Sequence, residues 1–263
     1  MNAAVPAPSL RGGPSGNSGA RGPCSGEAHV HQALVTTEAV HHCAGLLDAA
    51  ERERAGLLAE RAAARFIVAR GLLRSVLSAR LGVPPEDVAL AARCPGCGTS
   101  GHGPVRLAGD DAAGWALSVA HSGSLVAVAV GHESGPLGVD VETAERTADV
   151  GELAPRLFGP QQTSRFARLA APVRRAALLR AWTSAESYAK ATGTGLGHAL
   201  VRVGARLDAA GRVTVAGPEE LAGWSVRAVP ARAPGYAAAV TVRHGTRVHT
   251  HASTDLTAGP PAG

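Results

Sequence analysis

The order of elements along the chain predicts an α+β fold built from two similar halves. A helical segment over residues 61–82 is followed by Trp115 and a strand pair, and a second over 173–193 is followed by Trp224 and another strand pair. A helix followed by a hairpin is a common order, so coincidence stays open as an alternative to duplication. If the halves are related, they join near residues 131–137.

Composition sets the outer limits of the folded part. Both ends are rich in Gly, Pro, Ser and Ala, which predicts disordered tails over residues 1–28 and 246–263. Between them we expect an N-terminal half over 29–131 and a C-terminal half over 132–245. Hydrophobic residues make up 45% of the chain and aromatic residues only 3%. The core is therefore expected to consist of Ala, Val and Leu.

Charge and hydropathy restrict the class of protein. The net charge of +5 suits an anionic partner, but arginines on solvated helix faces would give the same charge, so nucleic acid is not expected. No apolar run is long enough to span a membrane, and the N-terminus lacks a continuous apolar signal region. Four cysteines in 263 residues do not make a disulfide scaffold. A cytoplasmic location is the default expectation.

The N-terminal half is predicted to begin with a long helix. Apolar residues at helical spacing indicate a helix over residues 51–81, which Gly82 and the two following prolines end. Arginines at 54, 61 and 65 share one face of this helix. Residues 93–104 are predicted to form a loop, and strands over 115–120 and 125–130 form a hairpin around the turn at 121–124.

The C-terminal half is predicted to begin with a third strand over residues 137–142. In this strand the alternation points Val139 and Val141 to one side. A helix is expected over 172–191, ended by glycines. Short strands are then predicted, over 199–203, 212–216, 224–229 and 236–242.

Carboxylates in this half suggest a cation site. Asp140 and Glu142 lie two residues apart on the strand, which puts them on one face about 6.5 Å apart along the backbone. Such a pair can share Mg²⁺, which prefers oxygen ligands, and Glu186 could supply a third carboxylate from the helix. Taken alone, a solvated strand face explains most pairs of this kind.

Lys190 is the only lysine among the 26 Lys and Arg residues. It follows Glu186 by one helical turn, so a surface Glu–Lys pair worth ~0.2–0.5 kcal/mol is one interpretation. The other is a compact ammonium that neutralises phosphate, which a planar guanidinium does not replace. His121 lies in the hairpin turn, either bonded to backbone or available to a ligand.

Together these residues resemble the Sfp-type 4′-phosphopantetheinyl transferases. The family's first motif, Ser-His-Ser, is similar to Ala120-His-Ser122, and its second, Gly-(Val/Ile)-Asp-(Val/Ile)-Glu, stands at Gly138–Glu142. Its third, Trp-(Ser/Thr)-x-Lys-Glu-(Ala/Ser)-(Tyr/Phe)-x-Lys, stands at Trp182–Lys190. The Arg-rich upstream helix is also similar, at Glu53–Arg74. The resemblance covers about residues 45–245, and the order and spacing of three motifs make it specific.

The resemblance implies an enzyme that transfers the 4′-phosphopantetheine arm of coenzyme A to a serine of an acyl or peptidyl carrier protein, releasing 3′,5′-ADP. It implies Mg²⁺ held by Asp140, Glu142 and Glu186 together with the pyrophosphate. Glu186, or Glu142 through a water, would be the general base.

The same resemblance implies how coenzyme A is held. Lys190 would pair with the α-phosphate side, and His121 would bond the pyrophosphate. Arg54, with Arg93 as second candidate, would bind the 3′-phosphate. The implied fold has two pseudo-symmetric halves, each a helix packed on a small antiparallel sheet, with the site in the cleft between them. A monomer acting on an acidic carrier protein is expected, and the Arg- and Ala-rich composition suggests polyketide or nonribosomal peptide pathways of secondary metabolism.

Two departures from the family pattern keep alternatives open. Ala185 stands where the family has a lysine, which we expect to remove a positive charge near the site, and Ala120 stands where the family has a serine. A carrier-protein binding module that has lost catalysis is therefore one alternative. Another Mg²⁺-dependent phosphate-transfer or hydrolysis enzyme using the same acids is the second.

Other candidate ligands lie outside the motifs. Cys94 and Cys97 with His102 allow a zinc site, but a structural site wants four ligands, so a reduced thiol loop is the preferred interpretation. Six histidines in or near the tails are expected to be solvent-exposed: His29, His31, His41, His42, His249 and His251.

Overall fold

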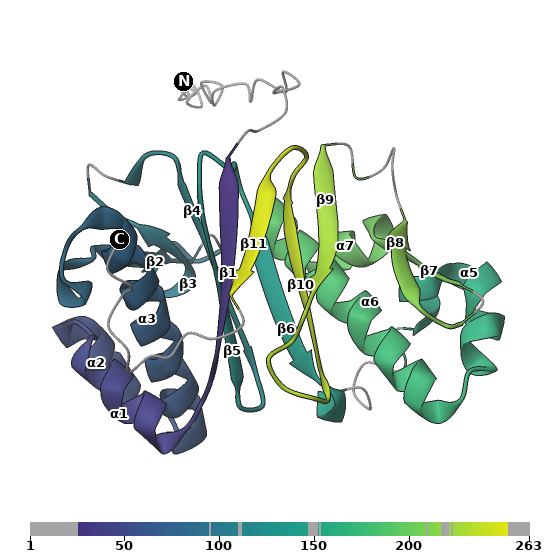
Figure 1. Cartoon of the computed structure of the whole chain (residues 1–263), viewed down its shortest axis with the longest axis horizontal. Helices are drawn as coiled ribbons and strands as arrows, with labels where there is room; N and C mark the ends of the chain where they lie inside the picture. Colours follow the sequence, from purple (N-terminus) through teal and green to yellow (C-terminus); the bar gives the residue numbers. More distant parts are fainter. Residues whose placement is uncertain are drawn as a thin grey trace, which may run out of the picture.

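The computed structural model describes residues 26–94, 96–109, 112–146, 152, 154–208, 210–216, 221 and 223–251. It has an α+β architecture, as the sequence predicts. Two helical groups flank a central set of strands, with α1–α3 on one side and α5–α7 on the other (Figure 1). No helix within the described residues is long and apolar enough to cross a membrane.

The first sheet has the strand order β11-β1-β5-β4. Its strands are β1 (Glu27–Leu34), β4 (Trp115–Ser122), β5 (Leu125–His132) and β11 (Arg247–His251). β1 pairs with β11 in parallel, while the β1–β5 and β5–β4 pairs are antiparallel. The sheet is therefore mixed, which corrects the prediction of a purely antiparallel one.

Three helices belong to this first sheet. They are α1 (Thr37–Gly45), α2 (Ala49–Gly56) and α3 (Glu60–Leu81), followed by the short turn η1 (Pro85–Asp87). Leucines and valines of α3 pack on the valines of β5 in one buried cluster. The single helix predicted over 51–81 is thus two helices, because α2 ends at Gly56, a poor helix former, and α3 starts afresh at Glu60.

The second sheet has the order β6-β10-β9, all antiparallel, and α6 packs on it. Its elements are β6 (Gly138–Thr143), β9 (Trp224–Val229), β10 (Tyr236–Arg243) and α6 (Ala171–Thr192), with η3 (Ala144–Arg146) after β6. Both α3 and α6 have 22 residues and end at a left-handed glycine. Whether the two halves are pseudo-symmetric stays a prediction.

The remaining elements extend the two halves. β2 (Leu90–Arg93) and β3 (Ser100–Leu107) form a hairpin where a loop over 93–104 is predicted. β7 (Gly204–Leu207) pairs with β8 (Val213–Ala216), and α5 (Ala154–Ala167) lies beside them. The strand predicted over 199–203 is wrong: α7 (Leu196–Arg202) is a helix there, because a short apolar run fits either element and packing on α6 decides.

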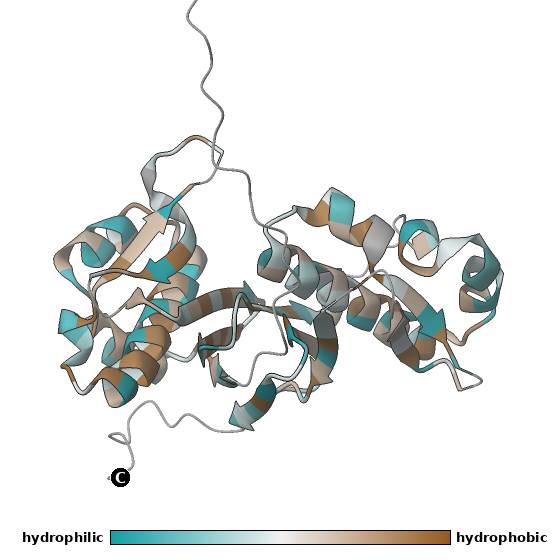
Figure 2. Cartoon of the chain, turned by 90° about the horizontal axis from the view of Figure 1, so that it is seen from above, coloured by the Kyte–Doolittle hydropathy of each residue, from teal (hydrophilic) through white to brown (hydrophobic). Residues whose placement is uncertain are grey.

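The core has three parts, and the prediction of a core made of Ala, Val and Leu fits two of them. The cluster between the sheets contains only Ala, Val and Leu among its buried members, and the cluster under α3 adds one cysteine. The third cluster, around α6, also buries Phe158, Phe166, Trp182 and Tyr188. Seen from above, the hydrophobic colouring runs along the central strands and the inner faces of the helices (Figure 2).

The two ends of the described chain meet in the first sheet. Residues 247–251, predicted to be disordered, form β11 beside β1, which itself starts at Glu27 within the predicted N-terminal tail. The remaining parts of both predicted tails, 1–25 and 252–263, lie outside the described residues. β11 escapes prediction because its sequence, Arg-Val-His-Thr-His, contains one apolar residue and carries no clear alternation.

Pairing of β1 with β11 also brings four histidines together, which we call the histidine ladder: His29, His31, His249 and His251. The expectation that these histidines are all exposed is wrong. His31 is buried, His29 and His251 are half-buried, and only His249 is exposed. Burial lowers the pKa of His31 to about 3 and that of His29 to about 4, so both are neutral at pH 7.

Candidate functional site

The two acids of β6 lie opposite a buried apolar face. Val139 and Val141 pack in the cluster between the sheets, and the alternation of the strand turns Asp140 and Glu142 the other way. Asp140 is 5% exposed, and Glu142 is half-buried. The predicted shared face therefore exists, but it is largely covered instead of being a solvated strand surface.

A glycine brings the helix close to these acids. A Cβ atom on Gly138 would lie 2.1 Å from the carbonyl oxygen of Ser187 and 2.6 Å from the backbone nitrogen of Ala191. Only glycine fits this approach of α6 to β6, which explains the glycine that precedes the acids in the motif. The Ser187 hydroxyl, 2.8 Å from that of Thr241, links α6 to β10 on the same side.

The close approach lets Lys190 reach across to β6. Its ammonium donates to Asp140 Oδ1 at 2.8 Å and to the carbonyl oxygen of Val139 at 3.1 Å. The compact ammonium thus binds a carboxylate and a backbone carbonyl together, a task for which a planar guanidinium is poorly shaped. The lysine side chain is 32% exposed, so it keeps partial access to solvent.

Asp140 is the most perturbed acid of the site. Burial raises its pKa to about 7, against the opposing effect of Lys190, and the charges of Glu186 and Glu142 raise it further. Both other carboxylates therefore act electrostatically on Asp140. Within the described part of the chain, Asp140 Oδ2 is buried and has no hydrogen-bond partner.

Glu142 is held from the first sheet. The hydroxyl of Ser122, at the end of β4, donates to Glu142 Oε2 at 2.5 Å and accepts from the backbone nitrogen of Thr143 at 3.2 Å. Ser118, on the same strand, accepts from the backbone nitrogen of Val139 at 3.0 Å. Two serines of β4 therefore fix β6, and with it the acids, relative to the first sheet.

A cleft of about 800 Å³ opens beside these residues. Its walls come from both halves: α3, the turn after β4, the end of β6 and the start of β10. The residues that line it are Val35, Arg61, Ala64, Arg65, His121, Ser122, Gly123, Ser124, Thr143, Glu145 and Tyr236. Its volume lies within the range of about 300–1,000 Å³ that small-molecule sites occupy.

His121 lies in this cleft at the end of β4. Partial desolvation lowers its pKa, and the positive charge of Arg65 nearby lowers it further. The turn that follows is fixed by Tyr236, whose hydroxyl accepts from the backbone nitrogen of Ser124 at 2.9 Å. Gly123, with φ of +53°, leaves room for that hydroxyl, since a Cβ there would lie 2.4 Å from it.

The arginines of the cleft are not those that the sequence favours. Among the described residues that line it, the arginines are Arg61 and Arg65, and Arg65 Nε is buried without a hydrogen-bond partner. Arg54 instead lies over the ring of Phe66, 5.7 Å from its centroid. Arg93 donates to the carbonyl oxygen of Gly98 in the β2–β3 hairpin at 2.9 Å.

The break between α2 and α3 explains this difference. In one continuous helix Arg54 would share a face with Arg61 and Arg65, but α2 ends before α3 begins. The four-residue spacing of Arg61 and Arg65 within one helix puts both side chains on the same face, and this spacing could have indicated from sequence that they lie together.

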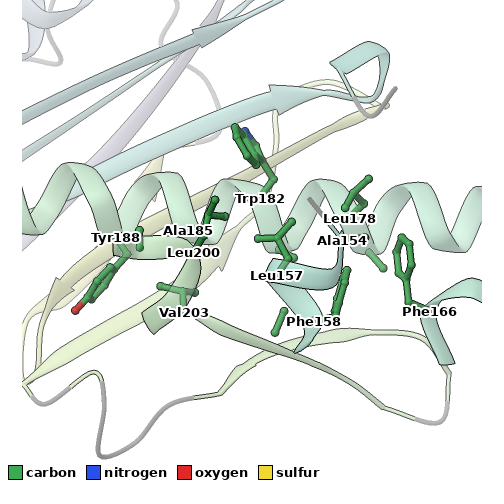
Figure 3. Close-up of a cluster of buried hydrophobic side chains, with 14 of the residues drawn as sticks. Ala154, Leu157, Phe158, Phe166, Leu178, Trp182, Ala185, Tyr188, Leu200 and Val203 are labelled. Atoms are coloured by element: carbon green, nitrogen blue, oxygen red, sulfur yellow. The ribbon is translucent and has the colours of Figure 1, made fainter. Parts of the chain in front are cut away.

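Both departures from the motifs lie at buried positions. Ala185 is fully buried among the side chains around α6, beside Trp182 and Leu200 (Figure 3). The expected loss of a positive charge near the site at position 185 stays a prediction. Ala120 is buried between the sheets, and its backbone pairs with Ala127.

The candidate zinc ligands Cys94, Cys97 and His102 lie outside the three motifs. Cys94 and Cys97 are free thiols at the β2–β3 turn, half-buried and exposed respectively. The side chain of His102 lies outside what the structure describes. The zinc interpretation of this loop therefore stays an untested prediction.

Comparison with known proteins shows a family resemblance over residues 136–241. The sequence model of the 4′-phosphopantetheinyl transferase superfamily matches residues 136–241. Over this part the chain is similar to members of that superfamily. The matched span contains Asp140, Glu142, Glu186 and Lys190, whereas His121, Arg61 and Arg65 precede it.

Two curated phosphopantetheinyl transferases are similar to the chain. The 4′-phosphopantetheinyl transferase HetI of Nostoc sp. is 33% identical over 134 residues, which are 50% of this chain and 53% of the relative. The putative 4′-phosphopantetheinyl transferase slr0495 of Synechocystis sp. is 29% identical over 139 residues, 53% of each chain. The chain thus matches about half the length of these relatives, and the resemblance drawn from the motifs is confirmed.

Proposed function

We propose that the protein transfers 4′-phosphopantetheine from coenzyme A to a serine of an acyl or peptidyl carrier protein. The observation that carries the proposal is the set of three carboxylates and one ammonium where β6 meets α6, next to a basic cleft of suitable volume. The match of residues 136–241 to the superfamily model and the two similar transferases support the same reaction.

The acids fit a hard divalent cation. Asp140 Oδ2 is a buried acceptor without a hydrogen-bond partner among the residues that the structure describes, and burial together with neighbouring negative charge raises the pKa of Asp140 to about 7. A dication would relieve both, so Asp140, Glu142 and Glu186 would hold Mg²⁺. When bound, Mg²⁺ would neutralise charge on the phosphate oxygens of coenzyme A.

The remaining groups would position the reactants. His121 and Arg65 would bind phosphate oxygens in the cleft, and Lys190 would neutralise the α-phosphate side while it holds Asp140 in place. Glu186 would accept the proton of the carrier serine hydroxyl. The serine oxygen then bonds to the β-phosphorus as the bond between that phosphorus and the bridging oxygen breaks, and 3′,5′-ADP leaves.

The carrier protein is the less specified reactant. A net charge of +5 favours an acidic carrier, and we include carriers of polyketide and nonribosomal peptide synthesis among the substrates to be tried. We also propose that the protein acts as a monomer in the cytoplasm.

The decisive experiment mixes the purified chain with coenzyme A, Mg²⁺ and an apo carrier protein, and weighs the carrier by mass spectrometry. We expect the carrier to gain the mass of phosphopantetheine. Glu186→Gln should lower the rate by ~10²-fold or more, because it removes the proton acceptor and a metal ligand. Glu38→Gln, an exposed glutamate on α1, is the matched control and should keep the full rate.

Other results would point elsewhere. A carrier that binds the protein but gains no mass would contradict transfer and favour a binding module. Hydrolysis of coenzyme A without transfer would favour a different phosphate chemistry at the same acids.

A further inference from the structure

The histidine ladder on β1 and β11 forms a second group of metal-binding residue types, on a different sheet from the acids. In the parallel register His29 faces His249, and His31 faces His251. The ring centroids of these pairs lie 4.8 Å and 4.1 Å apart, and the rings are stacked. Four imidazoles therefore meet where two strands far apart in sequence run side by side.

A carboxylate completes one end of the ladder. Glu27 Oε2 lies 3.7 Å from His29 Nε2, and Glu27 Oε1 lies 3.7 Å from His249 Nε2. The ligand atoms of all three residues lie within 4.8 Å of one another. Tetrahedral Zn²⁺ with bonds of about 2.0–2.1 Å separates its ligand atoms by about 3.3 Å, so small side-chain movements suffice.

We propose that Glu27, His29 and His249 bind a divalent late transition-metal ion such as Zn²⁺, separately from the acids of β6 and α6. Two imidazoles and one carboxylate form a donor set typical of zinc with three protein ligands, which leaves a fourth position for water or an added ligand. Mg²⁺ prefers a shell of oxygens and is not expected there.

The other half of the ladder supports the first. His29 Nδ1 lies 3.0 Å from His251 Nε2. When the hydrogen of His29 is on Nδ1 and is donated to His251, the lone pair of Nε2 faces Glu27 and His249. Metal-binding histidines usually have such a partner for the second ring nitrogen, which fixes their tautomer and orientation. His251 is in turn stacked on the buried His31.

Two arginines oppose binding and limit its strength. Arg247 donates to Glu27 Oε1 at 2.7 Å, so Glu27 would offer Oε2 to the metal. Arg80, in the last turn of α3, lowers the pKa of His29 and His31 through its positive charge. The carboxylate of Glu27 offsets the positive charge of Arg247, with which it pairs. Arg247 therefore opposes the binding of a cation beside the imidazoles less than an unpaired arginine would.

The first test is a titration of the full chain with Zn²⁺ in competition with a chromophoric chelator. We expect His249→Ala and Glu27→Gln each to weaken one binding event by about tenfold or more, and His251→Ala to weaken the same event by ~10–100-fold. His41→Ala, an exposed histidine on α1, is the matched control and should bind as the wild type does. Identical affinity and stoichiometry in His249→Ala and the wild type would overturn the proposal.

A second readout separates this site from the other ligands of the chain. In ¹H–¹⁵N spectra of the imidazoles, added Zn²⁺ should shift the ring nitrogens of His29 and His249, and Mg²⁺ should not. Shifts confined to histidines outside the ladder would overturn the proposal. Zinc held only by Cys94 and Cys97 would leave the ladder signals unchanged and would count against it equally.

A stability measurement completes the test. Zn²⁺ should raise the thermal midpoint of the wild type but not that of His249→Ala, because binding to the folded state alone stabilises it. His249 is exposed, so its replacement should leave the metal-free midpoint near that of the wild type. None of these readouts uses transferase activity, so the metal site and the proposed function can fail independently.

Discussion

The burial of Asp140 has two opposing effects. Burial between β6 and α6 keeps its carboxylate near the other acids, where a cation could be held, but the same burial raises its pKa to about 7. One of its oxygens is bound to Lys190, and the other has no hydrogen-bond partner among the described residues. The ionised carboxylate of Asp140 is therefore unfavourable in the folded protein and lowers its stability, and a bound cation would relieve this cost.

This cost predicts a pH dependence of stability. The unfolded Asp140 ionises near pH 4, while the folded one stays protonated to about pH 7. Between these values the unfolded state loses its proton first, so ionisation of Asp140 lowers the stability of the wild type as pH rises, by at most on the order of 4 kcal/mol. Above pH 7 both states are ionised and the difference stays constant.

Urea unfolding of Asp140→Asn and the wild type from pH 4 to pH 8, in a chelator, measures this effect. The stability of the variant relative to the wild type should grow up to about pH 7 and then level off. A difference that does not change with pH would contradict the raised pKa of Asp140.

Arg65 is the arginine for which we predict the largest effect on coenzyme A binding. It lines the cleft with a buried Nε atom, whereas Arg93 is bonded to its own hairpin. Loss of a charge-assisted contact worth about 1.5–3 kcal/mol should raise the KM for coenzyme A by roughly 10–100-fold in Arg65→Ala. Arg93→Ala serves as the control and should keep its KM. Steady-state kinetics measures both, and a larger effect at Arg93 would favour Arg93, the second candidate from sequence after Arg54.

At the scale of elements, the packing of α6 on β6 determines where the site residues lie. Gly138 allows the backbones of β6 and α6 to approach each other. Because of this close approach, Lys190 of α6 reaches Asp140 on the strand. Serines of β4 hold β6 from the other side. The acids are thus placed by contacts of three elements and not by a loop.

Gly138→Ala tests this packing directly. The added methyl group would meet backbone atoms of α6 at 2.1–2.6 Å, so we expect a loss of ~1–3 kcal/mol in stability together with a loss of activity. Gly197→Ala, on α7 with no atom near its added Cβ, is the matched control and should be neutral or slightly stabilising. Thermal unfolding and the transfer assay measure both. Full activity in Gly138→Ala would show that the close approach is dispensable.

At the scale of the whole molecule, β11, the last strand in the described part of the chain, forms one edge of the first sheet. Val248 of β11 packs against the cluster between the sheets, whereas Thr250 on the same strand is exposed. Two β-branched residues of one strand therefore have different roles.

Val248→Asp should lower the free energy of unfolding by roughly 1–2 kcal/mol, because a charge replaces a partly buried apolar side chain. Thr250→Asp should change it little. Chemical denaturation compares the two variants, and equal effects would argue that β11 contributes no packing to the core.

Much of the candidate site could be predicted from sequence because its residues stand in short motifs. Asp140 and Glu142 share a strand, Glu186 and Lys190 share a helix, and local periodicity orients both pairs. Which arginines line the cleft depends on a helix break at residues 57–59. The helical spacing of apolar residues continues through that break, and this periodicity hides the weak helix-ending signal of Gly56. Lys190 pairs with Asp140, a contact across 50 residues that no local spacing indicates.

The elements that escaped prediction are those whose pattern is weak on its own. In β1 the polar residues Glu27, His29 and His31 alternate with Ala28 and Val30, whereas β11 has a single apolar residue, Val248. Each becomes a strand only beside the other or β5. In α7 the run Ala-Leu-Val suits a strand or a helix, and the buried surface of α6 favours the helix.

The pairing of β1 with β11 also has a consequence for biosynthesis. Glu27 and Arg247, which join the two strands, are 220 residues apart, so a ribosome makes β1 long before its neighbour. Until β11 emerges, one edge of β1 has unpaired backbone groups that can accept a strand from another chain. The nascent protein is therefore expected to need protection at this edge, and its slowest folding step should be the closure of this distant pair.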